Sequence, residues 1–256
     1  MQKNKLKLTL KNNEPVFGVG ATFPLDLPTM RVLANCGIDW LFVDMEHGSG
    51  DISQLQDVAQ ILNLLGLTGV VRVPNLAYEW VARSLDTGLR SVMVPRVERR
   101  EQAELAVQWA KHPPVGVRGM GSHAQFDFTW LPAAEGVEVS NRETMVVLQI
   151  ETVEGVENVE AIASVPGIDV LFIGPLDLSI SLGRPGDVAS DESHRLFERI
   201  CQVARAHERA VGIVCAVEQV RFYYDMGIRM FSIGSVLTLL QAQVQAVEAE
   251  FRHQLV

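Results

Sequence analysis

The sequence predicts an α/β protein that folds as a single (β/α)₈ TIM barrel over residues 1–256. Two observations carry this prediction: eight short apolar runs alternate with eight amphipathic stretches, and no glycine-rich nucleotide-binding loop follows the first run. An open, doubly wound sheet is the main alternative for such alternation, and it often carries that loop. The length of 256 residues is typical of one barrel.

The eight apolar runs are the strand candidates. Strands of a parallel sheet are covered on both faces, so they contain few polar residues and many β-branched ones. In chain order the predicted strands are Val16–Thr22, Asp39–Asp44, Gly69–Val73, Ser91–Val94, Thr144–Ile150, Asp169–Ile173, Val211–Cys215 and Arg229–Ile233.

Helical periodicity fills the intervals between these strands. It is clearest in Ile52–Leu65, where Asp51 and Gln54 also form a predicted capping box at the start. The last helix carries the same apolar spacing from Val236 to Phe251. The other predicted helices are Thr29–Cys36, Tyr78–Thr87, Arg99–Lys111, Gly155–Ala163, Ser193–Glu208 and Glu218–Met226.

One segment, residues 112–143, breaks this rhythm. Its periodicity is weak, and long irregular segments in compact domains are often lids or binding loops. It connects a predicted helix to the strand that follows, so it lies at the N-terminal end of the predicted barrel. It would have to extend along the barrel to reach a site at the carboxyl ends of the strands.

The charge balance and the cysteines narrow the possible partners of the protein and its cellular compartment. Asp and Glu number 31 against 22 Lys and Arg, a net charge of −9 that argues against nucleic acid as the main partner. No apolar run approaches the roughly 18 residues of a membrane span. The basic first fifteen residues lack the apolar core of a signal peptide. The three cysteines have no zinc-finger or redox spacing, which favours reduced thiols in a cytoplasmic protein.

Polar residues at the carboxyl ends of the strands are the candidates for a site, because chemistry in such barrels takes place there. The candidates after predicted strands two, three, five and six are Asp44, Glu46, His47, Arg72, Gln149, Glu151, Gly174, Leu176 and Asp177. Four strands thus deliver charged or titratable groups to one rim.

Glu151 and Asp177 form the predicted metal pair. Two carboxylates with few other ligands leave positions for water and substrate, which suits Mg²⁺ or Mn²⁺. Each carboxylate alone could instead be an ordinary helix N-cap. Gln149 would hydrogen-bond into the same site, or it could be a polar residue of the barrel interior. The turn from Gly174 could present the backbone N–H groups of Leu176 and Asp177 to an anion, or it could be a tight turn only.

Arg72 and the pair of Asp44 and His47 are the candidate catalytic groups. A cation at a strand end can stabilise a developing oxyanion, although Arg72 could equally form a structural salt bridge with a neighbouring strand. A carboxylate three residues from a histidine can fix the tautomer of the ring and raise its basicity. Asp44 and His47 are therefore a candidate acid–base dyad.

The positions of the lysines argue against one class of aldolase. The chain has lysines at 3, 5, 7, 11 and 111, and none falls at the carboxyl end of a predicted strand. A Schiff-base aldolase needs a lysine there. An aldolase with this sequence is therefore expected to use a metal ion as its Lewis acid.

Segments spread over residues 15–240 resemble the HpcH/HpaI aldolase family, with its aldolases for 4-hydroxy-2-oxo acids and sugar acids. They follow the order of the family and are G-I-D-W-L-F-V-D-M-E-H-G, V-V-R-V-P, L-D-T-G, V-M-V-P-R-V, H-P-P-V-G-V-R-G, L-Q-I-E-T and D-V-L-F-I-G-P-L-D-L-S-I-S-L-G. The resemblance implies a barrel of the phosphoenolpyruvate/pyruvate type. It also implies a class II aldolase that reversibly cleaves a 4-hydroxy-2-oxo acid to pyruvate and an aldehyde.

The same resemblance implies roles by position. Glu151 and Asp177 would bind Mg²⁺ or Mn²⁺, with Co²⁺ as a further choice, and pyruvate would chelate that metal through its keto oxygen and carboxylate. Arg72 would contact the enolate oxygen. The backbone amides of Leu176 and Asp177 would hold the carboxylate, and Gln149 would line the site.

Proton transfer and assembly are implied as well. His47, oriented by Asp44, would move protons through water, and Asp86 of a neighbouring subunit would support that dyad. The family forms oligomers with exchanged C-terminal helices, so a homohexamer is expected.

The sequence departs from the family after Arg118-Gly119, where an arginine- and tyrosine-containing stretch is usual. This chain has Gly121–Phe128 instead, so the segment that would contact the distal end of the substrate differs. His123 could substitute for that contact or be an ordinary exposed histidine. Two other functions stay open: a CoA-thioester lyase of the citryl-CoA lyase type, and a non-catalytic barrel.

Overall fold

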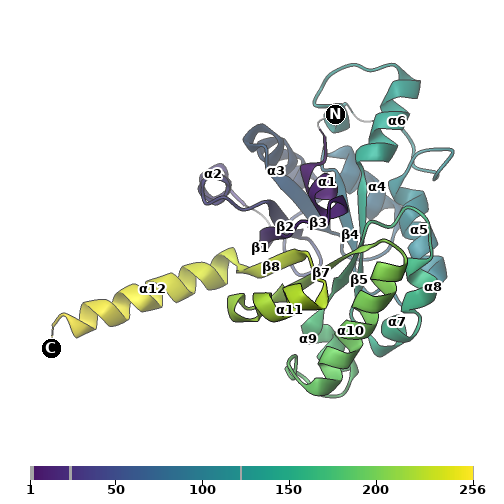
Figure 1. Cartoon of the computed structure of the whole chain (residues 1–256). Coiled ribbons are helices and arrows are strands. Elements are labelled where there is room, and N and C mark those ends of the chain that lie inside the picture. The colour runs from purple at the N-terminus through teal and green to yellow at the C-terminus, as the bar shows by residue number, and fades with distance from the viewer. Residues whose placement is uncertain (1–2, 23–24, 122, 256) are drawn as a thin grey trace.

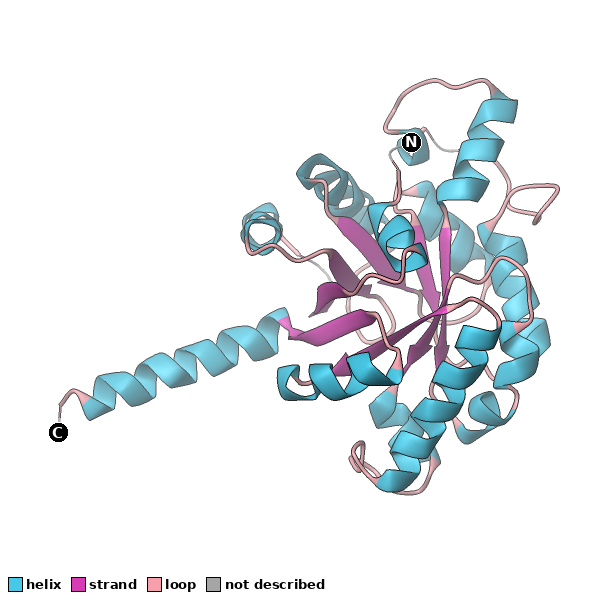
Figure 2. Cartoon of the chain, viewed as in Figure 1, coloured by secondary structure: helices cyan, strands magenta, loops and turns pink. Residues whose placement is uncertain are grey.

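The computed structural model describes residues 3–22, 25–121 and 123–255. Within these ranges eight strands close into one barrel, each parallel to the next, with β8 returning to β1 (Figures 1 and 2). The strands are β1 (Val16–Thr22), β2 (Trp40–Asp44), β3 (Thr68–Arg72), β4 (Ser91–Val94), β5 (Met145–Ile150), β6 (Val170–Ile173), β7 (Ala210–Cys215) and β8 (Met230–Ser235). The predicted (β/α)₈ barrel is confirmed.

Most of the helices cover the outside of the barrel between successive strands. They are α1 (Lys5–Lys11), α2 (Leu27–Asn35), α3 (Ile52–Leu65), α4 (Tyr78–Asp86), α5 (Arg100–Ala110), α6 (Ala133–Glu143), α7 (Val153–Glu157), α8 (Val159–Ala163), α9 (Pro175–Ser181), α10 (Asp191–Ala206), α11 (Val220–Met226) and α12 (Val236–His253). The predicted capping box of α3 is present: the Asp51 carboxylate accepts the N–H of Gln54 at 3.1 Å, and Gln54 Oε1 accepts the N–H of Asp51 at 3.2 Å.

Three helices lie where the sequence shows no clear helical period. α6 occupies the second half of the irregular segment 112–143. α1 and α9 are seven residues long, too short for periodicity to show. The predicted helix over 155–163 is divided into α7 and α8 at Asn158, whose side-chain amide donates to the backbone oxygen of Glu98 at 2.9 Å.

Large side chains fill the interior of the barrel. The rings of Trp40 and Phe172 meet edge to face there. Gly18 and Gly212 make room for them, because a Cβ on either glycine would lie 2.3 Å from the nearer of the two rings. Two leucines of α1 join the same buried cluster, so α1 closes the N-terminal end of the barrel. The carboxyl ends of the strands are the face on which the candidate catalytic residues lie.

α12 projects away from the barrel (Figure 1). Its apolar stripe is the one predicted from the sequence, and Leu240, Val244, Val247 and Phe251 are each 58–59% exposed. The stripe therefore has no cover within one chain. In the described ranges, no helix is both long enough and apolar enough to cross a membrane.

Candidate active site

Two charged residues end neighbouring strands and meet at the rim of the barrel. Asp44 is the last residue of β2 and Arg72 the last of β3, and the parallel register places them side by side. Arg72 donates from Nε to Asp44 Oδ1 at 2.9 Å and from Nη2 to Asp44 Oδ2 at 2.7 Å. Such bidentate pairing fixes the orientation of the guanidinium as well as its charge.

This pair stays ionised although it is largely buried. Burial alone would raise the pKa of Asp44, but the hydrogen bonds and the charge of Arg72 outweigh burial and hold that pKa below its ordinary value. Burial would lower the pKa of Arg72, and the carboxylates of Asp44 and Glu46 outweigh it and raise that pKa. The site therefore contains a permanent cation, which lies 5.1 Å from the centre of the Phe42 ring.

Gln149 connects this cation to a further carboxylate at the end of β5. Arg72 Nη1 lies 3.1 Å from Glu46 Oε2 and 3.5 Å from Gln149 Oε1. The side-chain nitrogen of Gln149 in turn donates to Glu151 Oε2. The ends of β2, β3 and β5 are thereby joined in one network of polar side chains.

Glu151 is a deeply buried carboxylate whose charge is opposed by its neighbours. It is 2% exposed, and its Oε1 accepts the backbone N–H of Arg96 at 2.9 Å. Burial, followed by the charges of Asp177 and Glu46, raises the pKa of Glu151 to about 7. A nearby cation would favour the ionised form of this group.

Glu151 and Asp177 suit a divalent cation in both charge and ligand type. Asp177 lies in the first turn of α9, close enough for its charge to act on Glu151. Carboxylate oxygens are the ligands that Mg²⁺ and Mn²⁺ prefer, and a pair of them leaves other coordination positions open. Across the described ranges, no three His, Cys, Asp or Glu side chains are grouped as a metal site.

The turn before α9 packs against these side chains. A Cβ on Gly174 would lie 2.8 Å from Glu151 Cβ and 2.5 Å from Glu151 Oε2, so a larger residue there would displace this buried carboxylate. The backbone N–H groups of Leu176 and Asp177 belong to the first turn of α9, where a helix offers them no acceptor of its own. The structure thus brings the predicted turn next to the predicted metal pair.

His47 lies at the edge of this group. Its side chain is 65% exposed, and Nε2 lies 3.9 Å from Glu46 Oε2. The carboxylate of Asp44, expected to orient the ring, pairs with Arg72 and accepts the backbone N–H of His47 at 3.4 Å. Within one chain Asp44 therefore fixes the turn that carries His47.

Asp86 binds elsewhere in its own chain. It ends α4, and its Oδ1 accepts a hydrogen bond from Arg118 Nη2 at 2.6 Å. Arg118 is 1% exposed and belongs to the irregular segment, so this ion pair ties that segment to α4. The action of Asp86 on the dyad of a neighbouring subunit stays a prediction.

Sequence reasoning missed the contacts that three residues make in and near this region. Glu46 was identified at its strand end, but its contact with Arg72 depends on the register of β2 and β3. Arg96 acts through its backbone N–H, for which a sequence carries no direct signal. Arg118 stands in the recognisable R-G segment, yet its complete burial was not expected.

Within the divergent segment, Ala124–Phe126 form a short turn beside α4. Gln125 and Phe126 are buried in a 3₁₀ turn, whereas Gly121 and His123 are exposed. Ser122 lies outside the described residues. Contact between His123 and a substrate stays a prediction.

Comparison with known proteins finds relatives that are named as aldolases. The chain is 34% identical over 253 residues to a 5-keto-4-deoxy-D-glucarate aldolase of Escherichia coli K12, with 97% of each protein covered. It is 32% identical over 250 residues to a hydroxypyruvate/pyruvate aldolase of Delftia acidovorans, covering 97% of this chain and 93% of that protein.

A solved structure agrees in fold as well as in sequence. An HpcH/HpaI aldolase/citrate lyase family protein from Burkholderia cenocepacia superposes with a TM-score of 0.91 at 30% identity, covering 98% of this chain and all of the other. Residues 24–242 match the family model described as HpcH/HpaI aldolase/citrate lyase. The chain therefore belongs to the HpcH/HpaI aldolase/citrate lyase family.

Proposed function

We propose that the protein is a metal-dependent pyruvate aldolase, which reversibly cleaves a 4-hydroxy-2-oxo acid to pyruvate and an aldehyde. The observation that carries the proposal is the network from the permanent cation Arg72 through Gln149 to the buried carboxylate Glu151. It provides one group for an oxyanion and one for a metal at the same rim. Relatives named as aldolases for a keto-deoxy sugar acid and for pyruvate support the reaction class.

Glu151 and Asp177 would hold the metal. When bound, a divalent metal supplies a Lewis acid that draws charge from the keto oxygen of the substrate. Mg²⁺ and Mn²⁺ are the preferred ions for this donor set, and Co²⁺ is a third candidate. The first-turn amides of Leu176 and Asp177 would bind the pyruvate carboxylate, as helix starts bind anions.

Arg72 would stabilise the negative charge that develops on the enolate oxygen. Asp44 holds two of its nitrogens, so the guanidinium is oriented before a substrate arrives. Preorganised donors of this kind lower the barrier because they need no rearrangement during the reaction.

His47 would move the proton of the substrate hydroxyl through water. Its ring is exposed to solvent and lies near Glu46, which suits proton exchange with water. Asp86 of a neighbouring subunit would orient this ring in the assembled protein.

The lysines support a metal-dependent class. Lys7 and Lys111 both donate to the backbone oxygen of Thr144, which precedes β5 at the N-terminal end of the barrel. The remaining lysines, at 3, 5 and 11, lie in or before α1. A Schiff-base aldolase would need a lysine at the opposite rim.

We further propose that the protein is a homo-oligomer, with six subunits as the expected number. The uncovered stripe of α12 supports exchange of this helix between subunits. The three cysteines are free thiols in the described chain, which supports a reducing compartment such as the cytoplasm.

A turnover assay tests the reaction. Pyruvate, Mn²⁺ and a panel of aldehydes should give 4-hydroxy-2-oxo acids, and the same products should be cleaved in reverse. Borohydride added with pyruvate should trap no covalent adduct. Turnover confined to a CoA thioester would show a lyase of the citryl-CoA type, and the absence of turnover with every aldehyde would favour a non-catalytic barrel.

A further inference from the structure

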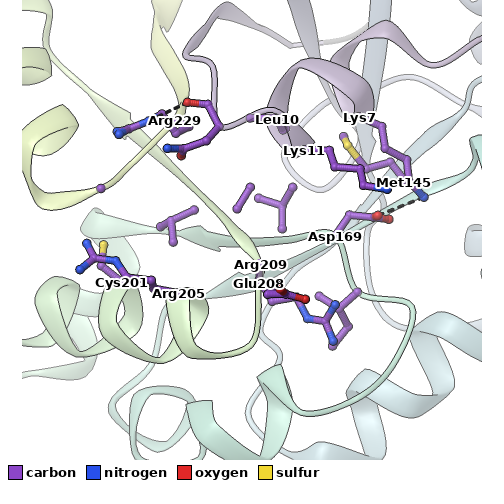
Figure 3. Close-up of a pocket in the computed structure, with 16 residues that line it drawn as sticks. Lys7, Leu10, Lys11, Met145, Asp169, Cys201, Arg205, Glu208, Arg209 and Arg229 are labelled. Carbon is purple, nitrogen blue, oxygen red and sulfur yellow. Dashed lines mark hydrogen bonds and ion pairs between the residues drawn. The ribbon is translucent and has the colours of Figure 1, made fainter.

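A cavity of about 880 Å³ opens at the N-terminal end of the barrel, opposite the proposed active site. Figure 3 shows the residues that line it. Its walls include the first residues of β5, β6 and β7, together with residues of α1 and the end of α10. The proposed aldol chemistry uses the carboxyl ends of the strands, so it does not account for a hollow at this end.

Basic side chains from separate elements gather around this cavity (Figure 3). They are Lys7, Lys11, Arg205, Arg209 and Arg229, and the acidic residues of the lining are Asp169 and Glu208. Five cations against two carboxylates leave a formal surplus of three positive charges. The whole chain has a net charge of −9, so this cavity is a local reversal of its charge. A concave basic surface attracts anions.

Two of the guanidiniums are held in place without being neutralised. Arg209 donates to the backbone oxygens of Ala163 and Val165, each at 3.2 Å. Arg229 donates to the backbone oxygen of Tyr224 at 2.9 Å and lies 4.1 Å from the centre of its ring. Backbone oxygens carry no full charge, so both arginines keep their positive charge while their orientation is fixed.

Of the three remaining cations, two are open to a ligand. The third, Lys7, is paired with Asp169 at 3.0 Å. Lys11 and Arg205 are exposed, and within the described ranges neither forms an ion pair with a carboxylate. Cations near the end of α10 could simply complement the helix dipole. Arg205 and Lys11 both lie in the last turn of a helix, α10 and α1, so each does complement a helix dipole. That role does not explain why both line one cavity together with Arg209 and Arg229, which lie outside the helices.

We propose that this cavity binds a small phosphate-bearing anion with at least two negative charges. The guanidinium fork matches phosphate oxygens, and lysines add point charges around it. The site would be separate from the aldol chemistry, because it lies at the other end of the barrel.

Calorimetric titration of pyrophosphate into the full-length protein tests the proposal. Ionic strength is held constant with chloride, and no divalent metal is added because pyrophosphate chelates such ions. We expect one pyrophosphate per chain. The double variant Lys11→Gln/Arg205→Gln should bind it at least tenfold more weakly, because two charged contacts are lost. Neither residue has an ion pair to break, so the fold should persist, as thermal unfolding can verify.

Arg195→Gln is the matched control, because it removes an exposed arginine from the same helix, away from the cavity. It should bind pyrophosphate as the natural protein does. Excess pyruvate should not compete with pyrophosphate. Absence of saturable binding, an equal loss in Arg195→Gln, or displacement by pyruvate would each overturn the proposal.

Discussion

Arg72 is the residue on which the proposed chemistry depends most. Asp44 occupies its Nε and Nη2, whereas Nη1 faces Glu46 at 3.1 Å and Gln149 at 3.5 Å. The longer contact, with Gln149, is weak by the usual distance of a hydrogen bond. We therefore expect an oxyanion to take the place of this weak contact at Nη1.

Alanine at Arg72 and at His47 should separate enolate stabilisation from proton transfer. Arg72→Ala should slow both aldol cleavage and exchange of the pyruvate methyl protons with deuterium, by about 10²–10³-fold, because both reactions need the enolate. His47→Ala should slow aldol cleavage by about 10²–10⁴-fold through loss of acid–base catalysis. Turnover assays and proton NMR in heavy water measure the two rates.

The affinity for Mn²⁺ provides the control for these variants. His47→Ala should bind Mn²⁺ as tightly as the natural protein, since His47 is not proposed as a ligand. A large loss of affinity would instead place the imidazole among the metal ligands.

Lys111 should make stability depend on pH. Burial, followed by the charge of Lys7, lowers the pKa of Lys111 from 10.5 to about 7. Between these values the unfolded chain holds a proton that the folded protein does not, so stability should rise as pH increases from 7 toward 10.5. Urea unfolding should show the stability of the natural protein, relative to Lys111→Met, rising by on the order of a few kcal/mol between pH 7 and pH 10. The variant also loses the hydrogen bonds from Lys111 to the backbone oxygens of Asn141 and Thr144, but that loss is present across the range and does not produce the change with pH.

An unchanged gap between the two proteins across that pH range would contradict this account of Lys111. Lys5→Met is a suitable control, because Lys5 is exposed on α1 and its replacement should leave the pH dependence unaltered.

The candidate residues could be found from the sequence because titratable side chains follow apolar strands. Their contacts could not be found that way. Asp44 was expected to face His47, three residues along the chain. Arg72, in register on the next strand, forms a bidentate pair with it instead. The closed barrel sets the register between strands. That register, and not nearness in sequence, determines which side chain pairs with Asp44.

Among the elements, α12 has the most exposed apolar surface without a partner in its own chain. Val244→Asp combined with Val247→Asp should break the predicted assembly, because charges would enter the surface that a second subunit covers. Light scattering should show a mass larger than a dimer for the natural protein and a smaller mass for this variant.

Gln245→Asp is the matched control, because helical geometry places Gln245 away from the stripe of Val244 and Val247. It should keep the natural mass. A monomer mass for the natural protein at micromolar concentration would contradict the proposed assembly and remove the role of Asp86 across an interface.

Strands were easier to predict than helices, for a physical reason. The strands are covered on both faces, so each one is a short apolar run. α6 instead turns small residues inward: its buried positions are Gly136 and Ser140, which give no apolar signal. The division of α7 from α8 depends on Asn158 and a distant backbone oxygen, a tertiary contact that periodicity does not report.

At the scale of the whole molecule, the two ends of the barrel differ in charge. Carboxylates gather where the strands end, at Glu46, Glu151 and Asp177, and basic side chains gather where several strands begin. The first group follows from reading strand ends in the sequence. The basic group could not be predicted from the sequence. Its members come from α1, α10 and the segments before β7 and β8, and only the fold brings them together.

The carboxylates Glu151 and Asp177 are proposed to hold a metal that the aldol reaction requires. The most direct measurement is the rate of 4-hydroxy-2-oxo acid cleavage before chelation, after chelation and after Mn²⁺ is added back. We predict that chelation abolishes cleavage and that Mn²⁺ restores it. We also predict that Glu151→Gln needs at least tenfold more Mn²⁺ because a charged ligand is lost. Full activity in metal-free protein would contradict the claim.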